Sequence, residues 1–205
     1  MKVAISQRID LYPNRFEIRD SLDQNLNFFS YNAGFLPIPV PNVGESLYKD
    51  KIKSKSFIED WIKEQDIKGI ILSGGNDINQ FPNRDFTEIS LLNYACVNNI
   101  PILGICRGMQ LISKKFGVEP KSISGHVNVR HNLSGNFSGE VNSFHNYGID
   151  RCPENFNCIA VSNKNDIEAI THRTKNIEGW MWHPEREKKF RKEDIDRLKF
   201  LFLKK

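Results

Sequence analysis

Short apolar runs alternate with amphipathic stretches through the first half of the chain. The apolar runs predict buried strands at residues 3–6, 35–40, 68–72 and 100–105. Between them, apolar positions recur at helical spacing, which predicts helices at 17–33, 57–64, 86–98 and 109–116. The first helix carries Ile18, Leu22, Leu26 and Phe29, and Gly34 closes it. This strand-helix rhythm predicts a parallel sheet with helices on both faces.

The second half has a different pattern. Short apolar segments joined by polar turns predict strands at 140–144, 158–162, 167–171 and 179–182, and a closing helix covers 191–202. The glycine- and serine-rich stretch 132–139 is predicted to be a mobile loop. We therefore expect an α/β fold: a flavodoxin-like three-layer sandwich with a mostly parallel central sheet and a small antiparallel region in the second half. Residues 1–205 are expected to form a single domain.

Composition narrows the functional classes. The chain has 205 residues, and its net charge of +4 is spread without the basic block of a nucleic-acid-binding protein. No apolar stretch reaches the roughly 20 residues of a membrane span, and the first residues turn polar too soon for a signal peptide. The four cysteines form no Cys-x-x-Cys pair, and no Cys/His spacing suits zinc. We expect a reduced cytoplasmic protein without a metal, a nucleic-acid partner or a membrane partner.

The strand at 100–105 leads into Gly104-Ile105-Cys106-Arg107-Gly108, with a helix-like segment after it. Glycines two residues either side of a cysteine relieve crowding at a sharp strand-to-helix turn. The sulfur of Cys106 would lie at a helix N-terminus, where the dipole favours the thiolate. By itself the pattern also fits a buried cysteine in an ordinary loop. Together with a downstream base, it predicts a nucleophile.

That base is provided by Trp182-His183-Pro184-Glu185, at the end of a predicted strand. His183 and Glu185 are two residues apart, so the carboxylate can orient the imidazole and stabilise its charge. Attack on a carbonyl also needs donors for the oxyanion. The N–H of Arg107 follows the nucleophile, and the loop containing Gly75 follows a neighbouring strand, so each can supply a donor.

Gly-Ile-Cys-Arg-Gly-Met-Gln, Ser-Gly-Gly-Asn-Asp and Trp-His-Pro-Glu resemble, in order and spacing, the class I glutamine amidotransferase-like superfamily. The Cys-Arg-Gly-x-Gln form and Asp77 are most similar to its stand-alone γ-glutamyl hydrolase branch. The resemblance implies that Cys106 is the nucleophile, with His183 as base and Glu185 as its partner. It implies further that Gly75 and Arg107 supply the oxyanion N–H groups.

The same resemblance implies the residues of a glutamyl pocket. Gln110 matches the glutamine that helps hold the glutamyl group, and the Asn-Ser-x-His segment supplies Asn142, Ser143 and His145. For His145 a packed histidine at a strand end is an equal alternative. Met181 stands where the family often has glutamine, so one pocket hydrogen bond is missing.

The implied reaction hydrolyses a γ-glutamyl amide through a cysteine thioester, without metal or cofactor. Four basic residues could meet a phosphate on the leaving group: Arg8, Arg84, Arg130 and His126. Arg8 is favoured because it follows a strand at the edge where ligands bind in open α/β sheets. The opening Ala-Ile-Ser-Gln-Arg also resembles chains of cell-surface polysaccharide synthesis, which implies a nucleotide phosphoramidate as leaving group. The expected partner is thus a small γ-glutamyl substrate, met by a monomer or a homodimer.

Two other functions remain open from the sequence. The first is a glutaminase subunit that delivers ammonia to a separate synthase, which the arrangement of the chain does not exclude. The second is a catalytically silent binding domain, because a fold does not dictate a function. The presence of a cysteine, a histidine and a glutamate together argues against the silent domain.

Overall fold

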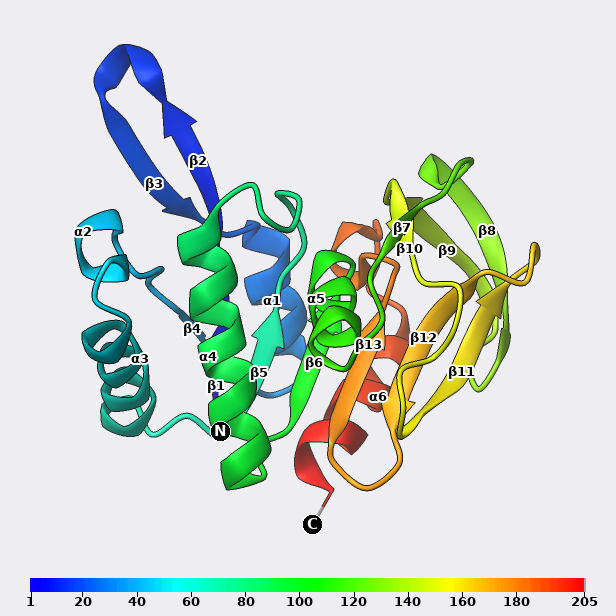
Figure 1. The fold of residues 1–205 in the computed structure, drawn as a ribbon. Coiled ribbons are helices and arrows are strands. Elements are labelled where there is room, and N and C mark those ends of the chain that lie inside the picture. Colours follow the sequence, from blue (N-terminus) through cyan, green and yellow to red (C-terminus); the bar gives the residue numbers. More distant parts are fainter. Residues whose placement is uncertain (205) are drawn as a thin grey trace.

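The computed structural model describes residues 1–204, and its centre is a nine-stranded sheet in the order β4-β1-β5-β6-β13-β12-β11-β8-β9 (Figure 1). These strands are β1 Lys2–Ile5, β4 Leu36–Pro39, β5 Gly69–Leu72, β6 Ile102–Ile105, β8 Val127–Gly135, β9 Gly139–Phe144, β11 Phe156–Ser162, β12 Ile167–His172 and β13 Ile177–Trp180. Two small sheets pair β2 Arg8–Tyr12 with β3 Glu17–Ser21, and β7 Lys121–Ser122 with β10 Tyr147–Gly148.

The first five strands of the large sheet are parallel. Numbered along the chain among themselves, they lie in the order 2-1-3-4-5, which is the flavodoxin-like arrangement and confirms the expected fold class. The fifth of them is β13, which begins two residues before its predicted start and lies parallel to β6, with Trp180 beside Ile105. The chain segments that follow β6 and β13 therefore leave the sheet at the same edge.

The antiparallel region is larger than the sequence analysis expected, because β12, β11, β8 and β9 extend the sheet by four strands. The predicted mobile loop at 132–139 is wrong for most of its length. Residues 132–135 belong to β8, where Leu133 is buried and pairs with Gly139 of β9. The glycines and serines that indicated a loop instead lie around the tight β8–β9 turn.

The predicted helix at 17–33 is also wrong in its first part. Glu17–Ser21 is strand β3, which pairs with β2 in a hairpin that projects from the body of the protein (Figure 1). The helix α1 begins only at Gln24, where the Asp23 carboxylate accepts a hydrogen bond from the N–H of Asn25. Ile18 fitted the helical spacing but lies 54% exposed in the hairpin.

Helices cover both faces of the parallel half, which completes the three layers (Figure 1). Helices α1 and α6 pack on one face, and α3, α4 and α5 pack on the other. The helices are α1 Gln24–Asn32, α2 Glu45–Tyr48, α3 Lys51–Glu64, α4 Pro82–Asn98, α5 Arg107–Lys115 and α6 Lys192–Leu203, with short 3-10 turns η1 Pro13–Arg15 and η2 Pro184–Arg186. Within residues 1–204, none of the helices combines the length and apolar character that spanning a membrane requires.

Candidate active site

Cys106 lies between β6 and α5 in a strained backbone conformation, with φ 51° and ψ −105°. Its N–H donates to the carbonyl of Trp180 at 2.7 Å, which joins the turn to β13. A Cβ on Gly104 would lie 2.6 Å from the backbone of Gly108, and a Cβ on Gly108 would overlap the carbonyl oxygen of Leu72. Both glycines are therefore required by the close packing of α5 against the sheet. This is the sharp turn that the sequence predicted.

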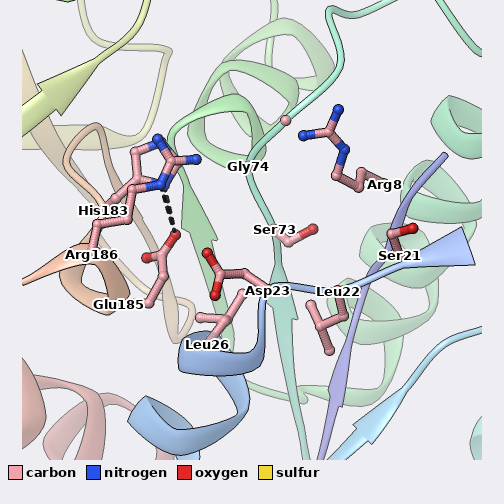
Figure 2. A pocket seen from close by; sticks show the side chains of 11 residues that line it. Arg8, Ser21, Leu22, Asp23, Leu26, Ser73, Gly74, His183, Glu185 and Arg186 are labelled. Carbon is pink, nitrogen blue, oxygen red and sulfur yellow. Dashed lines mark hydrogen bonds and ion pairs between the residues drawn. The ribbon is translucent and has the colours of Figure 1, made fainter. Parts of the chain in front are cut away.

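His183 follows β13 at the same edge of the sheet. The 3-10 turn η2 then brings Glu185 back, and its Oε1 lies 2.6 Å from His183 Nδ1 (Figure 2). Both side chains are buried. Gly74 lies against the ring, because a Cβ at this position would be 2.6 Å from His183 Cε1. The imidazole is thus held between a carboxylate and a backbone that has no room for a side chain.

The pKa of His183 depends on both Glu185 and Cys106. Burial by itself lowers the pKa of His183, but the Glu185 carboxylate and a hydrogen bond and charge interaction with Cys106 outweigh burial and raise the pKa to about 9. Because Nδ1 is bound to Glu185, Nε2 is the ring nitrogen that remains for the sulfur. Segments separated by more than seventy residues thus bring a cysteine, a histidine and a glutamate to the same edge of the sheet.

Asn142 holds the backbone on which His183 sits. Its Nδ2 donates to the carbonyl of His183 at 2.8 Å, and the N–H of His183 donates to its Oδ1 at 3.1 Å. The same Nδ2 also donates to Glu187 Oε1 at 2.7 Å. Asn142 was predicted to line a substrate pocket, and the structure instead directs its amide to the backbone behind the imidazole.

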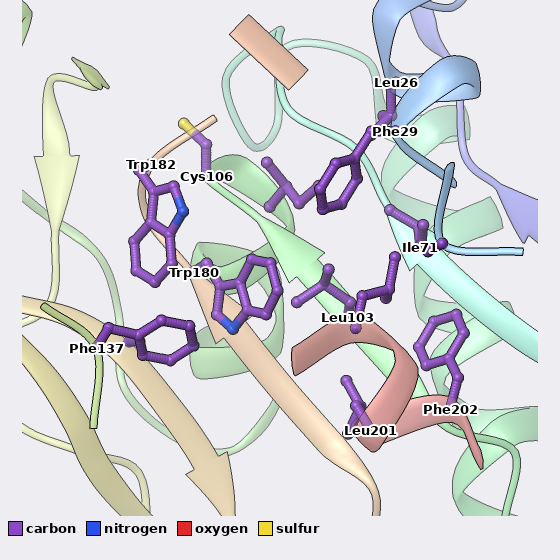
Figure 3. Packing of buried hydrophobic residues seen from close by; sticks show 14 of the residues in the cluster. Leu26, Phe29, Ile71, Leu103, Cys106, Phe137, Trp180, Trp182, Leu201 and Phe202 are labelled. Atoms are coloured by element: carbon purple, nitrogen blue, oxygen red, sulfur yellow. The ribbon is translucent and has the colours of Figure 1, made fainter. Parts of the chain in front are cut away.

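Aromatic side chains pack in the same buried cluster as Cys106 (Figure 3). The rings of Trp180 and Trp182 are parallel with centroids 5.3 Å apart, and Phe137 meets both of them edge-on. Cys106 belongs to the same buried cluster and is only 6% exposed. Trp182 directly precedes His183, so the segment that presents the imidazole is fixed by rigid, well-packed neighbours.

Arg84 is fully buried and shapes the loop after β5. Its Nη2 donates to the carbonyls of Ser73 and Gly74, at 3.0 Å each, and its Nη1 donates to the carbonyl of Gly75. With three successive carbonyls turned toward the guanidinium, the loop is held in one conformation. The suggestion that Arg84 meets a phosphate is therefore wrong, since its side chain has no exposed surface.

A buried ion-pair network joins this loop to the cysteine turn. Glu88 accepts from Arg84, from Arg107 and, at 2.7 Å, from Ser6 Oγ, and Arg107 also pairs with Asp85. Burial raises the pKa of Glu88, but the two guanidinium groups outweigh it and hold the pKa below its usual value. Sequence analysis missed this network because Arg84 and Glu88, four apart on a helix, have the spacing of an exposed pair.

A cavity of about 280 Å³ opens beside His183. Arg8 lies across it from His183 and Glu185, and Arg186 lies on the histidine side (Figure 2). Arg8 is 48% exposed, and its Nε donates to Asp10 at 2.8 Å. The remaining lining residues are Ser21, Leu22, Asp23, Leu26, Ser73, Gly74 and Gly75. Arg8 thus lies at the edge of this cavity, and the hairpin it begins forms part of one wall; its contact with a leaving group stays a prediction.

A second cavity, of about 200 Å³, lies along α5 and contains Gln110. Gln110 Nε2 donates to the carbonyl of Tyr147 at 3.0 Å, and His145 Nδ1 lies 3.1 Å from the same oxygen. The other predicted pocket side chains turn away: Ser143 Oγ donates to the carbonyl of His126. Among residues 1–204, Gln110 is the one predicted glutamyl-binding residue whose side chain lines either of the two cavities.

Comparisons with known proteins agree with this arrangement. The family described as "Glutamine amidotransferase class-I" matches residues 42–202. A γ-glutamyl-CDP-amidate hydrolase of Campylobacter jejuni is 39% identical over 59% of this chain and 64% of its own length, so this match leaves more than a third of either chain outside it. The glutamine-hydrolyzing GMP synthase subunit of Methanosphaera stadtmanae is 41% identical over 78% of this chain and 85% of its own.

Solved structures agree on the fold. A putative GMP synthase subunit from Thermoplasma acidophilum superposes with a TM-score of 0.71 at 21% identity, covering 98% of this chain and 92% of its own. A glutamine amidotransferase from Thermotoga maritima gives 0.63 at 13% identity, covering 97% and 82%. Fold and site together define an α/β protein with a cysteine at a strand-to-helix turn. The chain belongs to the class I glutamine amidotransferase family, as its motifs indicated.

Proposed function

We propose that this protein is a cysteine-dependent hydrolase of γ-glutamyl amides, with Cys106 as nucleophile, His183 as general base and acid, and Glu185 as the carboxylate that orients the imidazole. The observation that carries the proposal is the contact of His183 Nδ1 with Glu185 Oε1 at 2.6 Å, on a segment that leaves the sheet at the same edge as the Cys106 turn. A pKa of about 9 keeps His183 protonated at neutral pH, as the partner of a thiolate.

In this mechanism the Cys106 thiolate attacks the side-chain carbonyl of the γ-glutamyl group. The N–H groups of Gly75 and Arg107 stabilise the oxyanion, and one such donor contributes roughly 3 kcal/mol. His183 then gives its proton to the departing nitrogen and afterwards activates a water molecule, which hydrolyses the thioester and releases glutamate. Among residues 1–204 the N–H of Gly75 has no hydrogen-bond acceptor, which supports its role as a donor to substrate.

In this proposal, each of the two cavities binds a different part of the substrate. Gln110 lies one helical turn after Cys106, on the same side of α5, and lines the cavity of about 200 Å³, which suits a glutamyl group. The cavity of about 280 Å³ beside His183 then receives the leaving group. Its arginines, Arg8 and Arg186, are partly exposed, so they can meet an anionic group.

The arginines favour a phosphorylated leaving group over ammonia. The similarity to a protein named γ-glutamyl-CDP-amidate hydrolase supports γ-glutamyl-CDP-amidate as the substrate and capsular polysaccharide modification as the setting. Since a thiolate nucleophile needs a reducing environment, we also place the enzyme in the cytoplasm.

The second candidate is a glutaminase subunit that passes ammonia to a separate synthase. It is favoured by the similarity to proteins named as glutamine-hydrolyzing GMP synthase subunits, which extends over a larger part of both chains. The two candidates make opposite demands on the cavity beside His183. A partner protein has to cover it in the ammonia-delivering subunit, whereas a bulky anionic group enters it in the hydrolase.

Purified protein tested alone on glutamine and on γ-glutamyl phosphoramidates separates the two. We expect kcat/KM for a nucleotide γ-glutamyl phosphoramidate to exceed that for glutamine by at least about 10²-fold, since cavity contacts to the leaving group act only in the former. Arg8→Ala should raise KM for the phosphoramidate and leave glutamine hydrolysis unchanged, with Arg15→Ala in the hairpin turn as matched control. Strong glutaminase activity that appears only with a synthase present would overturn the first candidate.

A further inference from the structure

Three of the five histidines of the chain gather in the antiparallel half of the sheet, outside the pair formed by His183 and Glu185. His126 precedes β8, His131 lies on β8 and His145 follows β9. The ring centroids of His126 and His131 are 5.2 Å apart, and those of His126 and His145 are 4.8 Å apart. Glu168 of β12 completes the group, and all four residues are more than nine-tenths buried.

One carboxylate oxygen is the centre of this cluster. Glu168 Oε1 lies 3.4 Å from His126 Nδ1, 3.4 Å from His131 Nε2 and 3.8 Å from His145 Nε2. The potential ligand atoms of His126, His131 and Glu168 all lie within 4.8 Å of one another. Three separate β-segments thus direct their polar atoms to one point in the interior.

The outer faces of two rings show how the nitrogens are protonated. His126 Nε2 lies 3.0 Å from Asp166 Oδ2, and His145 Nδ1 lies 3.1 Å from the carbonyl of Tyr147. Because both of these partners are acceptors, each outer nitrogen carries a proton. The inner nitrogen of a neutral ring then presents a lone pair to Glu168. Metal-binding histidines are held in this way, with the second ring nitrogen donating to a carboxylate or a carbonyl.

Apart from a 3.4 Å contact between His126 Nδ1 and Ser143 Oγ, the inner atoms have no other hydrogen-bond partner among residues 1–204. Among residues 1–204, His131 Nε2, His145 Nε2 and both carboxylate oxygens of Glu168 are buried without a hydrogen bond. Lone pairs that face one another repel, and each unsatisfied buried group costs about 1–3 kcal/mol. A cation between these atoms would remove both costs.

We propose that His126 Nδ1, His131 Nε2 and Glu168 Oε1, with His145 Nε2 as a fourth ligand, form a binding site for a divalent transition-metal ion, with zinc as the best match. Zinc–nitrogen and zinc–oxygen bonds are about 2.0–2.2 Å long, which puts the ligand atoms of a tetrahedron about 3.3–3.6 Å apart. Glu168 Oε1 lies 3.4 Å from His126 Nδ1 and from His131 Nε2 and 3.8 Å from His145 Nε2, and the ligand atoms of His126, His131 and Glu168 all lie within 4.8 Å of one another, so the histidine rings have to move inward to bind the ion.

Three imidazoles and one carboxylate suit zinc better than magnesium or calcium, which prefer oxygen ligands. Four protein ligands leave no position open for water, so the ion has a structural role. It would fasten β8, β9 and β12 together. Met181, two residues before His183, donates from its N–H to the carbonyl of Glu168 at 2.8 Å, so the site also supports the strand end that carries the candidate base.

The competing occupant is a proton. The hydrogen bond with Glu168 raises the pKa of His126, so an imidazolium there would satisfy one contact. It would still leave His145 Nε2 without a donor, and burial lowers the pKa of His145 to about 4, which opposes a second proton. One metal ion satisfies all of these atoms together.

The test uses the full chain with Cys106→Ala, because the cysteine thiolate could itself bind zinc. After chelation and dialysis, added Zn²⁺ should bind at about one ion per chain by inductively coupled plasma mass spectrometry. It should raise the midpoint of thermal unfolding by several degrees, since a ligand that binds only the folded state stabilises it. Added Mg²⁺ should do neither, and Co²⁺ should give the visible absorption of a tetrahedral site.

Two isosteric variants, His131→Asn and Glu168→Gln, should each lower the bound zinc to below about 0.1 ion per chain. His172→Asn, on the same strand as Glu168 but outside the cluster, is the matched control and should keep the full ion. The proposal is overturned if the Cys106→Ala protein binds less than about 0.1 ion at excess zinc with an unchanged unfolding midpoint. Equal zinc in the control and in both cluster variants would overturn it as well.

Discussion

The side-chain amide of Asn142 makes two hydrogen bonds with the backbone of His183: it donates to the carbonyl at 2.8 Å and accepts from the N–H at 3.1 Å. A primary amide carries one donor and one acceptor group in a fixed geometry, so this pair fixes both the position and the direction of the peptide. The residue therefore acts on the imidazole through the main chain, across a distance of 41 residues in the sequence.

The first prediction follows from this relationship. Asn142→Ala should lower kcat by about 10²-fold while changing KM by less than about threefold, because a displaced base misaligns the chemistry without removing a substrate contact. Steady-state kinetics on a γ-glutamyl amide measures both constants. Asn132→Ala, at the exposed end of the same sheet region, is the control. A large rise in KM with constant kcat would instead mean that Asn142 binds the glutamyl group, as the sequence motif predicts.

The second prediction concerns the strain at Cys106. Cys106→Ala and Cys106→Gly should both lose more than about 10⁴-fold in kcat, because each removes the nucleophile. The two should differ in stability, since only glycine adopts φ 51°, ψ −105° without strain. Strain at such positions is about 1–3 kcal/mol, and glycine loses about 0.5–1 kcal/mol through the unfolded chain, so Cys106→Gly should be more stable by about 1 kcal/mol.

Urea unfolding of the two variants checks this difference, and Cys96→Ser, a cysteine on α4, is the control for activity. Intact-protein mass spectrometry of rapidly quenched wild-type enzyme should find a glutamyl adduct on Cys106 and not on Cys96. Activity that survives Cys106→Ala would show that the nucleophile lies elsewhere.

The third prediction uses the contact of Gly74 with the imidazole. A methyl group there would approach His183 Cε1 to 2.6 Å, so Gly74→Ala must displace the ring from Glu185. We expect a loss of about 10²–10³-fold in kcat/KM. Gly44→Ala, where nothing lies within 4 Å, should keep full activity and change stability by less than about 1 kcal/mol. Equal activity of both variants would mean that the imidazole is not held where the structure has it.

The turn at Cys106 and the pairing of His183 with Glu185 were predictable because each is a local pattern. Two glycines around a cysteine need only the geometry of a tight turn, and the proline between His183 and Glu185 restricts a short turn in which their side chains can meet. The supporting contacts were not predictable, because they join residues remote in the sequence. Nothing in the neighbourhood of Arg84 indicates that its guanidinium will meet three carbonyls of a loop before α4.

The errors in the fold have a similar origin. Ile18, Leu22, Leu26 and Phe29 have the period of a helix, yet the first of them belongs to a hairpin whose apolar side chains, apart from that of Ile9, stay exposed. Periodicity records burial and cannot indicate a strand pair without a buried face. In β8 the alternation of exposed and buried residues was hidden by polar and glycine residues, and the pairing with β9 outweighed their low strand propensity.

The fourth prediction concerns Arg84. Arg84→Lys keeps the charge but removes the planar fork that meets the carbonyls of Ser73, Gly74 and Gly75. Because buried acceptors and Glu88 lose partners, stability should fall by about 2–4 kcal/mol, and kcat should fall by about 10²-fold as the Gly75 N–H loses its alignment. Arg19→Lys in the exposed hairpin is the control for denaturant unfolding and kinetics. A normal kcat in Arg84→Lys would mean that the Gly75 loop does not contribute to the oxyanion site.

The last prediction is a pH profile. Because the folded pKa of His183 is about 9, against an ordinary value of 6.5, the ring stays protonated up to that pH, and kcat/KM should fall with a midpoint near 9. The same raised pKa means that the contribution of His183 to stability is complete below about pH 6.5 and is lost as pH rises through about 9. Glu185→Gln removes the largest influence that raises this pKa, so it should move the alkaline limb to lower pH and reduce kcat by up to about 10⁴-fold. Rates measured from pH 6 to about pH 10.5 test this, with Glu59→Gln on the remote helix α3 as control. An alkaline limb that keeps its midpoint in Glu185→Gln would mean that the carboxylate does not act on the imidazole.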